Sequence, residues 1–284
     1  MPEDLHSPAV AIMEPPGDAA AVVQFEGVSI AFDVKPVLQD ISFSVERGQT
    51  LVLLGPAGCG KSVLLKLTNG LLLPDSGSVR VFGEDIARLR RRDLYKLRGR
   101  IGMVFQESAL FDSLTVEENV AYRLHEEHVP EAEAHARVVE ALKFVELEAA
   151  IDKFPSELSG GMRRRVSIAR AIVSHPDLIL YDSPTGGLDP ITSTTIIELV
   201  MKQRDVSHTT SLMVTHRLQD AFILATHHFD PATGGMKPLP KDGPHDGIDQ
   251  GMKFLVLNEG KIAFHGTTEE LVHSDDPWIK QYLE

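Results

Sequence analysis

The eight residues Gly55–Ser62, Gly-Pro-Ala-Gly-Cys-Gly-Lys-Ser, constrain this chain more than any other stretch. They match the phosphate-binding pattern G-x-x-x-x-G-K-S/T without a gap. The apolar run Leu51–Leu54 before them predicts a short buried strand, and the residues after them predict a helix with Leu64 and Leu67 on one face. A glycine-rich turn that matched by chance would lack this context, so we expect a nucleoside triphosphate site.

The residue types of this loop suit the phosphates of a nucleotide. Glycines let backbone N–H groups turn inward, and the start of the following helix adds a favourable dipole. We expect Lys61 to reach the β- and γ-phosphates and the Ser62 hydroxyl to hold Mg²⁺. The residues expected to bind the nucleotide here are Gly55, Pro56, Ala57, Gly58, Cys59, Gly60, Lys61 and Ser62.

Composition narrows the classes of protein that could carry such a loop. The chain has 284 residues, 43% of them hydrophobic, and no apolar run approaches the roughly eighteen residues of a membrane-spanning helix. Met1–Asp18 lacks a basic start and an apolar core, so we expect no signal peptide. The single cysteine excludes an internal disulfide and suits a reducing cytoplasm. A net charge of −13 argues against a dedicated nucleic-acid binder.

Predicted strands and helices alternate along most of the chain, which indicates an α/β fold with a largely parallel sheet covered on both faces. Residues 1–20 are rich in proline and acids and predict a flexible tail, and residues 21–284 predict a single domain with a helical part over about 107–173. Residues 226–252 are rich in glycine and proline without periodicity and predict a mobile surface insertion. Its histidines lack a supporting ligand pattern, so we expect no metal there.

The strongly basic run Arg88–Arg100 has two possible interpretations. It can be the solvated face of a helix, or it can contact phospholipid headgroups or an acidic partner loop. Asp93 interrupts the run, and Leu94 and Leu97 need a core to pack against. These residues favour the solvated face.

Two further motifs lie downstream of the loop. The apolar residues Leu178–Tyr181 end in Asp182, the Walker B pattern, which places this carboxylate to hold Mg²⁺ rather than only to cap a helix. Ser159, Gly160 and Gly161 open a predicted helix and offer a hydroxyl and backbone donors to a second anion. Two phosphate sites on one small domain are explained if two copies pair head to tail, each covering the other's nucleotide.

These motifs resemble those of the ABC (ATP-binding cassette) ATPases over about Val22–Glu284. The likeness is carried by six motifs in the family's order: Gly55–Ser62, Gln106 of the Q-loop, the signature Leu158–Met162, Leu178–Asp182, the D-loop Gly187–Asp189 and His216 of the H-loop. It implies a P-loop NTPase fold with a RecA-like parallel-sheet core, an antiparallel β subdomain and a helical subdomain. ATP and Mg²⁺ are the cofactors that it implies.

The resemblance also implies roles for single residues. Phe32 lies where the family stacks an aromatic ring on adenine, and Gln106 joins the Mg²⁺ site to an integral-membrane permease that docks after it, near Leu110, Phe111 and Leu114. Across a homodimer, Ser159 and Gly161 contact the γ-phosphate. The residues assigned to catalysis are Lys61, Gln106, Ser183 and His216, those to the metal are Ser62, Gln106 and Asp182, and Asp189 completes the nucleotide site.

Within the family the chain is most similar to the Mla/Mce-type phospholipid-transport ATPases. This likeness is carried by Gly102–Ala121, Pro155–Met162, Asp189–Thr192 and Asp275–Leu283. It implies an ATPase that powers phospholipid transport from the cytoplasmic face of the inner membrane. Soluble ABC ATPases of repair or translation usually carry two cassettes or a long coiled-coil insertion, and this chain has neither.

Ser183 departs from the family pattern. After Walker B the family has a glutamate that activates the attacking water, and a serine hydroxyl is a poor base at neutral pH. We therefore expect ATP binding and dimer closure with slow hydrolysis. The alternatives are an engineered substitution, a neighbouring acid that takes the role, and a hydrolysis-deficient, ATP-gated clamp in a membrane complex.

Overall fold

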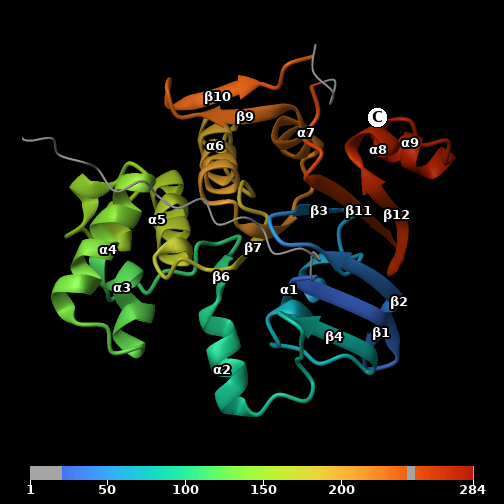
Figure 1. The fold of residues 1–284 in the computed structure, drawn as a ribbon, viewed down its shortest axis with the longest axis horizontal. Helices are drawn as coiled ribbons and strands as arrows, with labels where there is room; N and C mark the ends of the chain where they lie inside the picture. Colours follow the sequence, from blue (N-terminus) through green and yellow to red (C-terminus); the bar gives the residue numbers. More distant parts are fainter. Residues whose placement is uncertain (1–20, 242–246, 284) are drawn as a thin grey trace, which may run out of the picture.

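The structure, a computed structural model, describes residues 21–241 and 247–283. A six-stranded sheet lies at its centre, in the order β12-β11-β3-β8-β7-β6, and every neighbouring pair except β11–β12 is parallel (Figure 1). The strands are β3 (Thr50–Leu54), β6 (Ile101–Val104), β7 (Leu178–Asp182), β8 (Thr210–Val214), β11 (Met252–Asn258) and β12 (Lys261–Thr267). The predicted parallel core is confirmed, and the predicted tail over residues 1–20 lies outside the described residues.

Alternate residues of the central strands enter two different hydrophobic cores. On β3, Val52 and Leu54 belong to the core under the helices, whereas Leu51 and Leu53 belong to the core shared with the second sheet. Successive side chains of a strand point to opposite faces, so a strand that is apolar throughout must be covered on both sides. The continuous apolar sequence of β3 therefore follows from its central position.

The second sheet is antiparallel, in the order β2-β1-β4-β5, and packs against Leu64, Leu65 and Leu67 of α1 (Lys61–Thr68). Its longest strands alternate buried and exposed residues, as expected of a sheet with one face in water. The strands are β1 (Val23–Phe32), β2 (Lys35–Val45), β4 (Ser76–Val81) and β5 (Glu84–Asp85). This sheet confirms the antiparallel β subdomain.

A helical subdomain covers one end of the central sheet (Figure 1, green to yellow). It is built from α3 (Val116–Glu126), α4 (Glu131–Phe144) and α5 (Gly160–Ile172), with two 3₁₀ turns at Glu148–Ala150 and Pro155–Glu157. Thr115 caps α3 by accepting a hydrogen bond from the Glu118 N–H, and the Glu118 carboxylate accepts from the Thr115 N–H. This reciprocal capping box is predicted by the Thr-x-x-Glu spacing.

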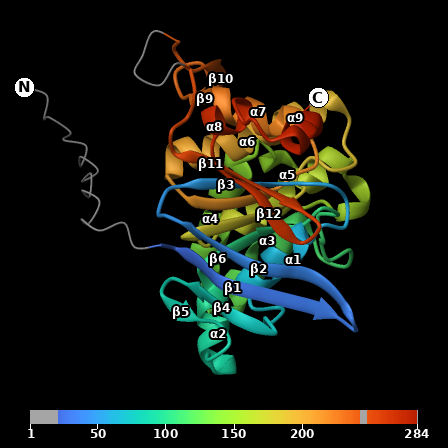
Figure 2. The same ribbon diagram turned by 90° about the vertical axis from the view of Figure 1, so that its right-hand side faces the viewer.

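The remaining helices follow the strands in the chain. They are α1 (Lys61–Thr68), α2 (Arg91–Gly99), α6 (Pro190–Ser207), α7 (Leu218–Thr226), α8 (Thr268–Val272) and α9 (Pro277–Leu283). Figures 1 and 2 place α2 at the end of the molecule opposite β9 and β10. On α2, Leu97 is buried and Arg98 donates to the carbonyls of Asn69 and Gly70, while most other cations of the basic run are exposed. Among the described residues, no helix combines the length and apolar character needed to cross a membrane.

The insertion over residues 226–252 has regular structure in part. It contains a hairpin of β9 (His227–Asp230) and β10 (Gly235–Pro238), which the lack of periodicity in this segment did not predict. Strands of four residues are too short for a readable alternation, and they are stabilised by tertiary contacts instead. Phe229 and Met236 pack against the main core. His245 lies outside the described residues.

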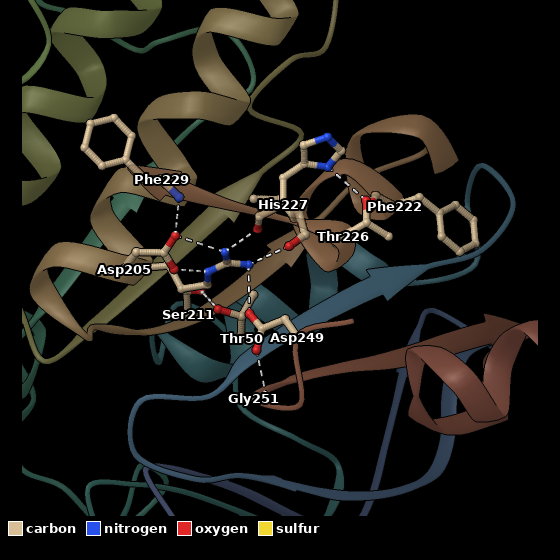
Figure 3. Close-up of polar contacts among 11 residues, drawn as sticks. Thr50, Asp205, Ser211, Phe222, Thr226, His227, Phe229, Asp249 and Gly251 are labelled. Carbon is tan, nitrogen blue, oxygen red and sulfur yellow. Dashed lines mark hydrogen bonds and ion pairs between the residues drawn. The ribbon is translucent and has the colours of Figure 1, made fainter. Parts of the chain in front are cut away.

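Arg204 of α6 anchors the insertion through its contacts with Asp205, His227 and Asp249, which Figure 3 labels. Its guanidinium binds both carboxylate oxygens of Asp205, at 2.6 and 3.1 Å, and one oxygen of Asp249 at 2.9 Å. It also donates to the carbonyl of His227, at 2.8 Å, and Asp205 accepts from the Phe229 N–H. One buried cation therefore joins both ends of the insertion to the core.

Candidate functional site

Predicted site residues meet at the carboxyl edge of the parallel sheet. Strand β8 lies between β3 and β7, with Val214 opposite both Leu53 and Asp182 in register. The phosphate-binding loop leaves β3, His216 follows β8, and Ser183 follows β7 at this edge. Gln106 follows β6, the next strand along. Ligands of open α/β sheets bind beyond this edge, so the topology collects these residues at one site.

Two glycines of the loop are required by its path. Gly55 has φ 141°, and a Cβ there would lie 2.3 Å from the Leu257 carbonyl oxygen. Gly60 has φ 106°, and a Cβ there would lie 2.6 Å from the Leu38 side chain. The loop thus runs tightly between β11 and β2, in conformations that favour glycine.

Lys61 points back into the loop. Its ammonium donates to the carbonyls of Gly55 at 2.7 Å and Pro56 at 2.8 Å, and it lies 3.6 Å from the Cys59 sulfur. Both Lys61 and Cys59 are buried. The Lys61 ammonium therefore lies inside the loop, where the phosphates of a nucleotide are predicted to bind.

Ser62 and Asp182, two of the residues predicted to hold Mg²⁺, lie within hydrogen-bond distance of each other. The Ser62 hydroxyl donates to the Asp182 carboxylate at 3.2 Å. Burial raises the pKa of Asp182, and this is opposed by the Ser62 hydrogen bond and by the charges of Lys66 and Lys61.

These two oxygen ligands fit Mg²⁺, which is commonly held by one or two carboxylates together with substrate phosphates and water. In the described part of the chain, no group of three His, Cys, Asp or Glu side chains is placed to hold a metal by itself. A site of this type therefore depends on the phosphates for its remaining ligands.

Ser183 sits in a tight turn after β7. It is 7% exposed with φ 48°, its N–H donates to the Val214 carbonyl, and its own carbonyl accepts from the Gly186 N–H. The buried carboxylate of Asp220 is already engaged, since it accepts from the Thr185 hydroxyl and pairs with Arg217. The turn thus presents a hydroxyl at the place where the family has a carboxylate.

The signature residues pack against the D-loop region of the same chain. Ser159 caps α5 by accepting from the Met162 N–H at 3.2 Å, and a Cβ on Gly161 would lie 2.5 Å from the Thr192 side chain. Thr192 in turn donates to Asp189, which caps α6. Among the described residues, no hydrogen bond joins the signature to the phosphate-binding loop of its own chain. The signature and the D-loop therefore lie beside each other, since Gly160 faces Leu188 and Gly161 faces Thr192.

Phe32 is 44% exposed at the end of β1, beside the turn into β2. Further along β2, Val37 and Leu38 lie against Gly60 of the loop. The ring is thus on a strand pair that touches the loop, and it makes no stacking contact with another ring in the described residues.

Two residues of the site are absent from the sequence prediction. The Tyr282 hydroxyl of α9 accepts a hydrogen bond from the Gly55 N–H at 2.9 Å. Arg164 of α5 is 3% exposed and donates to four backbone carbonyls around Gln106 and Ser183. A signal for Arg164 exists, because helical spacing places it on the same face as the buried Ile168 and Ala171. No comparable signal points to Tyr282.

The segment after Gln106 presents aromatic side chains to solvent. Phe111 is 43% and Tyr122 44% exposed, and their ring centroids lie 4.7 Å apart. The segment is held by the buried Asn119, which donates to the carbonyls of Phe111 and Leu114 and accepts from the Phe111 N–H. Leu110 and Leu114 are half-buried. The exposed apolar surface here is therefore carried mainly by the two rings.

Comparison with known proteins gives consistent matches. The ABC transporter family model matches residues 38–186. The intermembrane phospholipid transport system ATP-binding protein MlaF of Haemophilus influenzae is 34% identical over 249 residues, covering 87% of this chain and 84% of MlaF. MlaF of Escherichia coli K12 is 34% identical over 266 residues, covering 93% and 89%. A dimeric ATP-binding cassette, solved in a post-hydrolysis state with ADP and phosphate, has a TM-score of 0.70 at 27% identity, covering 86% of this chain and 98% of its own.

Proposed function

The chain belongs to the ABC transporter family of ATP-binding cassette ATPases, and from this membership we propose that it powers a phospholipid transporter of the Mla/Mce type. Proteins of this family bind ATP with Mg²⁺ and couple its hydrolysis to transport. The phospholipid substrate is supported by the likeness to two MlaF proteins over most of both chains. The protein acts at the cytoplasmic face of a membrane, where it is bound to permease subunits.

The main support for the nucleotide site is the hydrogen bond from the Ser62 hydroxyl, at the end of the phosphate-binding loop, to the Asp182 carboxylate at 3.2 Å. Ser62, Asp182 and Gln106 hold Mg²⁺, which neutralises charge on the phosphates. Lys61 contacts the β- and γ-phosphates, and His216 orients the γ-phosphate from the neighbouring strand.

Two copies pair head to tail. The signature of one chain, Ser159 to Gly161, then covers the nucleotide held by the loop of the other, while Asp189 lies at the contact between the copies. The contact between the signature and the D-loop supports this arrangement, because it places Ser159 to Gly161 and Asp189 together at the proposed contact between the copies. The dimeric assembly of a structural neighbour supports it as well.

The permease docks on the exposed rings after Gln106. Aromatic side chains supply large contact area at interfaces, and the rings of Phe111 and Tyr122 already contact each other with their planes tilted by 35°. Asn119 fixes the loop that carries Phe111, so the surface is preformed. A displacement of Gln106 on nucleotide binding then reaches the permease through a short segment.

Ser183 favours a second function, an ATP-gated clamp. Without a carboxylate at this position, the roughly 10²–10⁴-fold contribution of a positioned base is mostly lost. Phosphate positioning by Lys61, His216 and Mg²⁺ remains, so ATP would still close the dimer. In this mode ATP binding and release, rather than rapid hydrolysis, set the state of the complex.

The test of the nucleotide site is the ATP-dependent assembly of the purified chain. Light scattering should show a dimer with MgATP and none for Lys61→Ala under the same conditions. The transport role is tested with the chain and its permease in nanodiscs, by following phospholipid transfer between donor and acceptor membranes. Transfer that persists unchanged in the Lys61→Ala complex would overturn the transport role while leaving the nucleotide site intact.

A further inference from the structure

Arg164 joins the signature helix to two loops of the nucleotide site. One terminal nitrogen of its guanidinium, Nη1, donates to the carbonyls of Ser183 at 3.0 Å and Pro184 at 2.9 Å. The other, Nη2, donates to the carbonyl of Gly186 at 3.3 Å and to that of Gln106. A single side chain thus contacts both the Q-loop and the turn after Walker B.

This arginine is buried without an acid. It is 3% exposed, and none of the ion pairs between described residues includes it. Burial lowers its pKa, and its Nε has no hydrogen-bond partner. A buried charge needs compensation, which here comes from carbonyl dipoles alone. The loop carbonyls are therefore fixed by the charge, and the charge depends on their positions.

The two loops also touch each other directly. A Cβ on Gly186 would lie 3.1 Å from the Ser183 carbonyl oxygen and 3.2 Å from the Gln106 side chain. The Ser183 N–H is bound to β8. There is no spare room at this contact, so a shift of either loop would be transmitted to the other.

We propose that Arg164 is a positioning residue that sets Gln106 against the Ser183 turn and ties both to the signature helix. This inference rests on the proposed function, because it takes Gln106 and Asp182 as Mg²⁺ ligands. A planar guanidinium can reach four carbonyls in fixed directions, whereas the point charge of a lysine cannot reproduce that fork. Movement of α5, when its signature meets the partner's nucleotide, is then passed to the Mg²⁺ site of its own chain.

The test compares Arg164→Lys with Arg165→Lys as a matched control. Arg165 is the next residue of α5, and its side-chain hydrogen bonds within the described residues go to the carbonyls of Val145 and Glu146, in the helical subdomain. The affinity for a fluorescent ATP analogue is measured in EDTA and at a series of Mg²⁺ concentrations. The Mg²⁺ midpoint is the Mg²⁺ concentration at which half of the increase in affinity is reached. This readout needs no hydrolysis, and loss of folded protein would reduce its amplitude without moving its midpoint.

For Arg164→Lys we expect the Mg²⁺ midpoint to rise on the order of tenfold, within the roughly 10²-fold that a misplacement of about 1 Å can cost. Its affinity in EDTA should stay within about twofold of the native chain, and Arg165→Lys should match the native chain in both measurements. Equal midpoints for the Arg164 and Arg165 variants would overturn the proposal.

A second variant covers the case in which Arg164→Lys does not fold. Gly186→Ala adds a methyl group between the two loops and leaves the Arg164 side chain unchanged, and it should raise the Mg²⁺ midpoint in the same direction. If Gly186→Ala had the same Mg²⁺ midpoint as the native chain, the proposed coupling between the two loops would be contradicted. If the native chain itself shows no Mg²⁺-dependent affinity, the proposed nucleotide site fails, which is a separate result.

Discussion

The Tyr282 hydroxyl accepts a hydrogen bond from the Gly55 N–H, at 2.9 Å, across 227 residues of sequence. Its ring stacks on Trp278, with centroids 5.4 Å apart and planes at 9°. Helix α9 therefore contacts the first residue of the phosphate-binding loop, and it stabilises the loop from outside the nucleotide site.

Removing this hydroxyl should loosen the loop. In Tyr282→Phe the Gly55 N–H loses its acceptor while the ring stack is kept. An unsatisfied buried donor costs about 1–3 kcal/mol, so we expect that loss in the free energy of unfolding and a severalfold weaker affinity for ATP. Urea unfolding and nucleotide titration measure the two effects. Tyr122→Phe, on an exposed ring, should change stability by less than about 0.5 kcal/mol; an equal loss in both variants would contradict the assigned role.

Arg204 should be the main anchor of the insertion. Arg204→Met leaves the half-buried carboxylates of Asp205 and Asp249 without their cation, which we expect to cost about 3 kcal/mol. Urea unfolding measures the loss, and limited proteolysis should cut first within residues 226–252. The comparison is Arg137→Met, which breaks the more exposed pair with Glu133 and should cost at most about 1 kcal/mol. Matching losses would mean that the network adds nothing beyond a surface pair.

Local patterns predicted much of the fold. The apolar runs of β3 and β7 and the capping box at Thr115 were readable, because each signal lies within a few adjacent residues. The loop and Asp182 were readable for the same reason. The Tyr282 contact joins two distant segments, and no local pattern encodes it. Strands β9 and β10 depend on contacts with α6 and Arg204, which the chain reveals only when folded.

We expect the ionised Asp182 to lower the free energy of unfolding while it favours Mg²⁺ binding. Burial raises its pKa in the folded chain, so ionising it costs stability, and the free energy of unfolding falls as the pH rises from the unfolded toward the folded pKa. Asp182→Asn removes this step, which should raise the melting temperature near neutral pH. The Mg²⁺ midpoint for nucleotide binding should rise about 10–100-fold.

Unfolding curves recorded between about pH 4 and 7 measure this step. Asp230 provides a comparison of opposite sign: a hydrogen bond from Lys237, with others from Ala232 and Thr233, lowers its pKa to about 2. The ionised Asp230 stabilises the fold, and this contribution is lost as the pH falls through its folded pKa. Asp230→Asn should remove this pH dependence and leave the Mg²⁺ midpoint for nucleotide binding unchanged. A lower melting temperature for Asp182→Asn would mean that the Ser62 hydrogen bond outweighs the cost of burial.

Ser183→Glu addresses the missing base directly. Ser183 already has φ 48°, so glutamate meets the same backbone conformation, and its carboxylate would extend from the turn that follows Asp182. We expect Mg²⁺-dependent ATP hydrolysis to rise by about 10²–10⁴-fold, the usual contribution of a positioned base. Phosphate release from the native chain, Ser183→Glu and Lys61→Ala measures it, and Lys61→Ala gives the blank.

The double variant Lys61→Ala, Ser183→Glu shows whether the gain belongs to this site, since its rate should return to the blank. A native rate near the blank, with a fast Ser183→Glu, means that the chain holds ATP long enough for binding itself to keep the dimer closed. A native rate equal to that of Ser183→Glu means that another group activates the water. Asp220 is already bound by Thr185 and Arg217, so that group would be a different one, and the clamp would fail.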